Sequence, residues 1–143
     1  MDTLPRSILA DTGPLFALLH ARDVEHERAV QFSKAFTGLL ITTWLVVAEV
    51  GYLLDRSDRR GIDPLLGMIL GGNLAVADLD GEDVQSMRRS MAKYDTMDLA
   101  DASLVVIGER LGILDVVTLD RRDFSQYRTR ARQAFTNHFP ARQ

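Results

Sequence analysis

Short apolar runs separated by turn residues predict a set of buried strands. Each run holds three to seven residues and ends at a polar residue or a glycine, as expected for strands covered on both faces. A further short run near the end of the chain is weaker, because it lies in a polar, arginine-rich stretch. The predicted strands are Ser7–Ala10, Leu39–Thr42, Leu74–Val76, Ile113–Leu119 and Ala134–Thr136.

Longer segments between these runs predict helices. Pro14 falls in the first turn of the first helix, Thr43 is a helix N-cap, and Gly112 stands where a helix would stop. The segment Val24–Phe36 has apolar positions at helical spacing, which indicates an amphipathic helix. The other predicted helices are Leu15–Leu19, Trp44–Leu54, Ile62–Leu70, Gly81–Lys93 and Asp98–Leu111.

Strands that alternate with helices predict an α/β fold with a parallel sheet and helices on both faces. The length of 143 residues fits one domain spanning 1–143. In such sheets the functional crevice lies outside the carboxyl ends of the strands. Asp11 and Asp120 each follow a predicted strand, so both are expected at the same edge of the sheet.

Four acidic residues stand in apolar surroundings: Asp11, Glu49, Asp101 and Asp120. An ionised carboxylate in a low-dielectric interior is costly unless it is paired or binds a metal. Their pattern therefore predicts a carboxylate cluster that holds a hard divalent cation. Oxygen ligands favour Mg²⁺ or Mn²⁺ over softer metals, with one or two ions in the site.

Structural roles compete with this interpretation at most of these acids. Asp11 is also a plausible cap for the helix near Pro14, and Asp120 a loop acid paired with an arginine. A buried arginine partner is the structural alternative for Glu49, although its apolar neighbours favour a role in the site. Asp98 fits both an N-cap and an additional ligand. Asp123 is interpreted as a cap or ion-pair residue of the loop after Asp120.

A second acidic group, at residues 78–83, has a simpler explanation. Asp78-Leu79-Asp80-Gly81 resembles the start of a calcium loop, but its glycine is misplaced and the later bidentate glutamate is missing. Turn and helix-start chemistry therefore accounts for this group.

Composition excludes several classes of function. The chain has no cysteine, which rules out disulfides, thiolate zinc sites and a cysteine nucleophile. A net charge of −3 argues against a mainly electrostatic nucleic-acid coat, although local basic patches still permit an RNA enzyme. No signal peptide or membrane span is expected, and we predict a cytoplasmic protein.

Four motifs, taken together, resemble the PIN domain and, within it, the VapC-type toxin ribonucleases of bacterial toxin–antitoxin pairs. They occur in the expected order over nearly the whole chain. The motifs are Ile8–Leu15, Thr42–Trp44 with Ala48–Val50, Leu99–Ala102, and Thr118–Phe124.

This resemblance implies a three-layer α/β/α sandwich around a mostly parallel sheet of four to five strands. It places the family's acidic quartet on Asp11, Glu49, Asp101 and Asp120, with Asp98 as a further carboxylate. The implied activity is endonucleolytic hydrolysis of RNA by metal-bound water. It also implies a homodimer and a cognate VapB-type antitoxin.

Residues near the acids are candidates for holding the RNA. Thr12, Arg121 and Arg122 flank the predicted site, and the two arginines offer positive charge to phosphates. The competing interpretation is that each arginine is simply a solvated surface residue.

Three other classes of protein share part of this pattern. Haloacid-dehalogenase-like phosphatases need a second aspartate where Gly13 stands, and phosphate-receiver domains need a late lysine where Arg121 and Arg122 stand. A PIN-like scaffold that binds RNA or protein without cleaving it remains the alternative.

Overall fold

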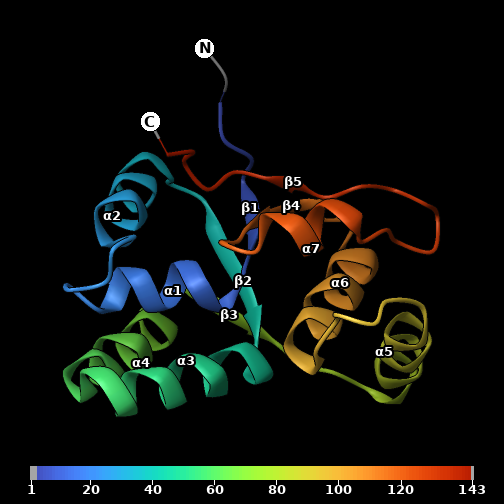
Figure 1. The fold of residues 1–143 in the computed structure, drawn as a ribbon, viewed down its shortest axis with the longest axis horizontal. Coiled ribbons are helices and arrows are strands. Elements are labelled where there is room, and N and C mark those ends of the chain that lie inside the picture. Colours follow the sequence, from blue (N-terminus) through green and yellow to red (C-terminus); the bar gives the residue numbers. More distant parts are fainter. Residues whose placement is uncertain (1–2, 143) are drawn as a thin grey trace.

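Five parallel strands form one sheet at the centre of the computed structural model, which describes residues 3–142. Their order across the sheet is β3-β2-β1-β4-β5 (Figure 1). The strands are β1 (Ser7–Ala10), β2 (Leu39–Thr43), β3 (Leu74–Ala77), β4 (Asp115–Val117) and β5 (Thr136–Asn137).

The central strand β1 is apolar because both of its faces are covered. Ile8, Leu9 and Ala10 have no exposed surface. Leu9 pairs with Ile41 of β2 on one side and Val116 of β4 on the other. A strand buried on both faces lacks the alternation of a half-exposed strand, which is why a continuous apolar run identified it.

Helices cover both sides of the sheet, with α1–α4 on one side and α5 and α6 on the other (Figure 1). This arrangement confirms the predicted α/β/α sandwich and makes its sheet wholly parallel. The helices are α1 (Thr12–Leu19), α2 (His26–Ala35), α3 (Trp44–Ser57), the 3₁₀ turn η1 (Arg59–Gly61), α4 (Ile62–Leu70), α5 (Gly81–Lys93), α6 (Leu99–Leu111) and α7 (Arg121–Gln126).

Helix α6 is the most enclosed helix of the described chain, with every residue from Ala100 to Gly108 buried. Its packing against the sheet depends on a glycine. A Cβ built on Gly108 would lie 2.7 Å from the carbonyl oxygen of Ile113 and 3.0 Å from Leu9. The helix ends at Gly112, whose φ of 69° is the left-handed conformation of a C-terminal cap, as predicted.

Several predicted boundaries were wrong. Helix α2 begins at His26 rather than Val24, because the Asp23 side chain forms a turn by accepting from the Glu25 amide. The fourth strand covers only Asp115–Val117, and the fifth lies at Thr136–Asn137. Helix α7 was not predicted. It forms where Asp120 caps a single short helix that has no long apolar period.

The acidic group at residues 78–83 acts as a helix start, as predicted. Asp80 and Asp83 form a reciprocal capping box at the beginning of α5. Asp83 also pairs with Arg110 of α6 at 3.3 Å, which ties α5 to its neighbour.

None of the helices within residues 3–142 is long and apolar enough to cross a membrane.

A matched pair of glycine substitutions tests the close approach of α6. Gly108→Ala is expected to destabilise the fold by about 1–3 kcal/mol, because the added methyl meets a backbone carbonyl. Gly67→Ala, inside α4 and with nothing within 4 Å of the added carbon, is expected to stabilise by up to about 1 kcal/mol. Urea unfolding of both variants measures the difference. Equal effects would contradict the close approach of α6 to the sheet at Gly108.

Candidate metal centre

Carboxylates gather at one edge of the sheet, where strand ends and helix starts meet. Asp11 directly follows β1, and Asp120 follows the neighbouring strand β4 after two residues. Asp98 and Asp101 stand at the start of α6. Parallel strands bring their carboxyl ends to the same edge, so the fold places the two strand-end acids together as predicted.

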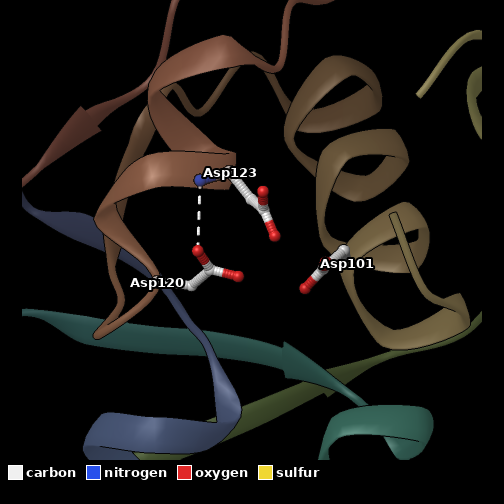
Figure 2. Close-up of side chains that lie close together, drawn as sticks. All are labelled: Asp101, Asp120 and Asp123. Carbon is white, nitrogen blue, oxygen red and sulfur yellow. Dashed lines mark hydrogen bonds between the residues drawn. The ribbon is translucent and has the colours of Figure 1, made fainter. Parts of the chain in front are cut away.

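Three of the carboxylates form a tight group. Asp101, Asp120 and Asp123 each offer an oxygen, and these oxygens all lie within 4.8 Å of one another. Asp101 comes from α6, whereas Asp120 and Asp123 come from the cap and first turn of α7 (Figure 2). Their side chains point toward a common space, which is the arrangement that a cation-binding site requires.

Thr118 connects Asp11 to this group. Its hydroxyl donates to Asp11 Oδ2 at 2.7 Å and accepts from the Asp120 amide at 2.9 Å. Thr118 is fully buried and Asp11 is 6% exposed. One hydroxyl therefore fixes both the rotamer of the first acid and the backbone of the second.

The position of Thr118 is set in turn by Asn137 of β5. The Asn137 side chain accepts from the Thr118 amide at 3.2 Å and donates to the Thr118 carbonyl at 3.1 Å. Its Oδ1 also accepts from the Phe139 amide. The side chain thus acts like a further peptide group of the ladder, just beyond the last residue of β4.

Asp101 is held by a tyrosine. The Tyr127 hydroxyl donates to Asp101 Oδ2 at 2.9 Å, and its ring packs edge-on against Tyr94 and Phe124. Tyr127 is 1% exposed, so its hydroxyl is not available to stack or bind from solvent. The contact of this tyrosine with an acid was not predicted from the sequence.

Asp98 is the N-cap of α6. Its Oδ1 accepts from the Asp101 amide at 2.8 Å. The side chain is also close enough that its charge raises the pKa values of Asp11, Asp101 and Asp120. Asp98 is therefore a helix cap, as one alternative predicted. It also lies close to the other acids, so its role as an additional ligand stays a prediction.

Glu49 lies half-buried on α3. It is outside the group of three, but its charge contributes to raising the pKa of Asp11. A hydrogen bond of 2.7 Å between the hydroxyls of Thr43 and Ser103 holds the start of α3 against α6. This bond therefore fixes the position of α3, which carries Glu49, relative to α6, which carries Asp101.

Asp123 was interpreted incorrectly as the cap or ion-pair residue. Asp120 is the cap, because its Oδ1 accepts from the Asp123 amide at 3.1 Å (Figure 2). The Asp123 carboxylate accepts from the Thr96 hydroxyl and faces the other acids. The spacing of three residues between the two aspartates could have revealed this, since it places both on one helix face.

Burial and mutual repulsion raise the pKa values of the central acids. Burial is the largest cause of the rise of the Asp11 pKa to about 6, opposed by the Thr118 hydrogen bond. Burial also dominates the rise of the Asp101 pKa to about 7, with repulsion from Asp11 and Asp98 next. Burial raises the pKa of Asp120 in the same direction.

Cationic side chains do not neutralise this negative charge. Among residues 3–142, no lysine, arginine or histidine forms an ion pair with Asp11, Glu49, Asp98, Asp101, Asp120 or Asp123. The alternative in which an arginine pairs with Asp120 or Glu49 is therefore not found among the described residues. Within that part of the chain, the buried hydroxyl of Thr12 beside Asp11 also has no hydrogen-bond partner. An oxygen-only donor set with uncompensated charge fits a hard divalent cation.

The arginines of α7 take different positions. Arg121 donates through Nη2 to the carbonyl oxygens of Phe139 and Pro140, at 2.8 and 3.2 Å. Arg122 is exposed. Both flank Asp120 along the chain, and their role toward a substrate stays a prediction.

A family model and two known proteins match this chain. The model of the PIN domain covers residues 8–129. The chain belongs to the PIN domain family. It is 29% identical to ribonuclease VapC26 of Mycobacterium tuberculosis (strain ATCC 25618 / H37Rv) over 126 residues, which cover 85% of this chain and 92% of that protein. These matches confirm the resemblance to PIN domains and to VapC-type proteins.

A solved structure confirms the fold. The crystal structure of Mycobacterium tuberculosis VapC20, described as a sarcin–ricin loop cleaving toxin, matches with a TM-score of 0.73 and 19% sequence identity. The match covers 80% of this chain and 91% of that one.

The raised pKa values predict how stability depends on pH in metal-free protein. The carboxyl groups of Asp11 and Asp101 bind protons more tightly in the folded state than in the unfolded state. The folded state therefore holds more protons between about pH 4 and about pH 7. Stability should therefore fall as pH rises through that window. Asp101→Asn should flatten the fall and stabilise the protein at pH 7.5 by about 1–2 kcal/mol.

Thermal melts in EDTA from pH 5 to pH 7.5 measure this dependence. Asp63→Asn, on the exposed first turn of α4, removes the same charge at a distance and is the matched control. A variant Asp101→Asn that melts like Asp63→Asn at every pH would contradict the prediction.

Proposed function

We propose that this chain is a metal-dependent endoribonuclease that hydrolyses RNA phosphodiester bonds with metal-activated water. The observation that carries the proposal is the convergence of carboxylates from four separate segments on one edge of the sheet, where Asp11 and Asp101 are buried and no acid of the group has an ion-pair partner among the described residues. Keeping this much like charge together is unfavourable without a cation, so the arrangement has a functional rather than a structural explanation.

The relatives support RNA as the substrate. The protein VapC26, which aligns over most of both chains, is named a ribonuclease, and the VapC20 structure is described as that of a toxin that cleaves the sarcin–ricin loop. Membership of the PIN family and the similarity to VapC26 support the proposal that this chain is also a nuclease.

The proposed metal ligands are Asp11, Glu49, Asp101 and Asp120, joined by Asp98 and Asp123. Their oxygens suit one or two ions of Mg²⁺ or Mn²⁺. When bound, such an ion would activate water and offset the negative charge on the scissile phosphate. No side-chain nucleophile is proposed.

The chain itself supplies orientation. Thr118 fixes Asp11 through its hydroxyl, and Tyr127 fixes Asp101. The amides at the starts of α6 and α7 hold one oxygen of Asp98 and one of Asp120. Ligands held in this way need little reorganisation when they bind a cation. Thr12, Arg121 and Arg122 are the proposed contacts to the substrate.

The remaining features follow from family membership and belong to the same proposal. We expect a toxin that acts in the cytoplasm as a homodimer and is inhibited by a cognate VapB-type antitoxin. A guanidinium from the antitoxin would pair with the carboxylates and compete with the cation. Residues 1–143 would form one PIN-like domain.

Cleavage by purified protein tests the catalytic assignment. RNA should be cut at discrete internal positions in Mg²⁺ or Mn²⁺ and left intact in EDTA. Asp11→Asn should lower the cleavage rate roughly 100-fold, because it removes a charged oxygen from the site. The control Asp63→Asn should cleave as the unmodified chain does.

Calorimetric titration with Mn²⁺ separates a nuclease from a non-catalytic scaffold. The unmodified chain should give a saturable heat of Mn²⁺ binding, and Asp11→Asn should give none. Full cleavage by Asp11→Asn, or no heat with the unmodified chain, would contradict the proposal.

Expression in a bacterial host tests the toxin assignment. Induction should arrest growth, and sequencing of RNA 5′ ends should reveal discrete cuts that are absent with Asp101→Asn. Co-expression of the neighbouring open reading frame should restore growth. Growth arrest without RNA cuts would separate toxicity from the nuclease activity.

A further inference from the structure

Three arginines from distant parts of the chain meet beside the acidic site. Arg28 lies on α2, Arg121 begins α7, and Arg142 pairs with Glu25, the residue just before α2. We refer to Arg28, Arg121 and Arg142 as the basic cluster. It is formed only by the fold, because Arg28 and Arg121 are 93 positions apart in the sequence.

The segment 139–142 joins these side chains. Arg121 donates to the carbonyl oxygens of Phe139 and Pro140, and Arg28 donates through Nη1 to the same Pro140 carbonyl at 2.8 Å. The Arg28 guanidinium also stacks over the Phe139 ring, 5.2 Å from its centre. These contacts fix the two guanidinium groups and leave further N–H donors on each of them.

Positive charge exceeds negative charge in this cluster. Glu25 is the carboxylate that the described residues supply, and it pairs with both Arg28 and Arg142. Burial lowers the pKa of Arg28, and repulsion from Arg142 and Arg121 lowers it further. Three guanidiniums around one carboxylate leave a local excess of about two positive charges, which favours an anion.

A cavity of about 510 Å³ opens between these residues. Its lining consists of Glu25, Arg28, Leu119, Arg121, Ala141 and Arg142. Leu119 and Arg121 are the two chain neighbours of Asp120, so the cavity adjoins the acidic site through the first turn of α7.

We propose that the basic cluster binds a phosphate of the RNA strand at a nucleotide away from the scissile bond. This inference rests on the proposed function, since it takes RNA as the substrate. Guanidinium groups match phosphate oxygens through paired N–H donors and stay charged at every physiological pH. An acidic site repels RNA, and a cationic contact nearby supplies the attraction that the acids cannot.

An acidic peptide from a protein partner is the competing ligand. The continuity of the cavity with Asp120 favours RNA, because a strand lying across the acids reaches the basic cluster along α7.

Fluorescence anisotropy with a labelled single-stranded RNA of about 12 nucleotides tests this inference in EDTA, with RNA integrity checked on a gel. Arg121→Gln and Arg142→Gln should each weaken binding roughly tenfold, the effect of losing one charge-assisted hydrogen-bond donor. Each should also reduce the slope of log K against log salt by about 0.7.

Arg89→Gln is the matched control. It removes the same charge from an exposed site on α5, where Arg89 bonds only Ser86 among the described residues. Arg142→Gln guards against misfolding, because the Arg142 side chain is 70% exposed. Melting temperatures of all variants establish that they are folded.

The outcomes distinguish this inference from the proposed function. If Arg121→Gln and Arg142→Gln bind RNA as Arg89→Gln does, the basic cluster is not a phosphate site, even if the chain cleaves RNA. If the two variants lose binding to the partner from the neighbouring frame but keep RNA affinity, the peptide is the ligand and the inference is overturned. Weakened RNA binding supports it, and stands even if no cleavage is detected.

Discussion

The carboxylates at the edge of the sheet repel one another, and the fold has to hold them together against that repulsion. Two such charges about 4 Å apart repel by roughly 4 kcal/mol at an effective dielectric of 20. Asp11 and Asp101 are both almost wholly buried, and neither has a cationic partner among the described residues. The fold must therefore be stable enough elsewhere to hold these groups together.

The scaffold meets this demand with short elements rather than long ones. The core strand β1 and helix α6 are buried almost completely, and they end or begin at the acids. Helix starts add favourable terms, because Asp98 and Asp120 accept backbone N–H groups at the positive ends of α6 and α7. Repulsion is thus offset by apolar burial on one side and by oriented amides on the other.

The elements that carry the acids could be predicted because their signals are local. The apolar run before Asp11 and the stop at Gly112 each depend on a few adjacent residues. The third carboxylate of the tight group was missed because α7 is too short to show a helical period, so Asp123 seemed to belong to a loop. The supports of the site were also missed. Thr118, Tyr127 and Asn137 act through contacts between distant segments, such as the bond between Thr118 and Asp11, and no spacing in the sequence reports them.

Asn137 gives the edge of the sheet a consequence for the chemistry. Its side-chain amide bonds both backbone groups of Thr118, and Thr118 in turn positions Asp11 and Asp120. The two-residue strand β5 is small, yet through the side chain of Asn137 it controls the position of residues at the acidic site. A molecule that grips the outer border of the sheet would loosen the ligand geometry without ever entering the pocket.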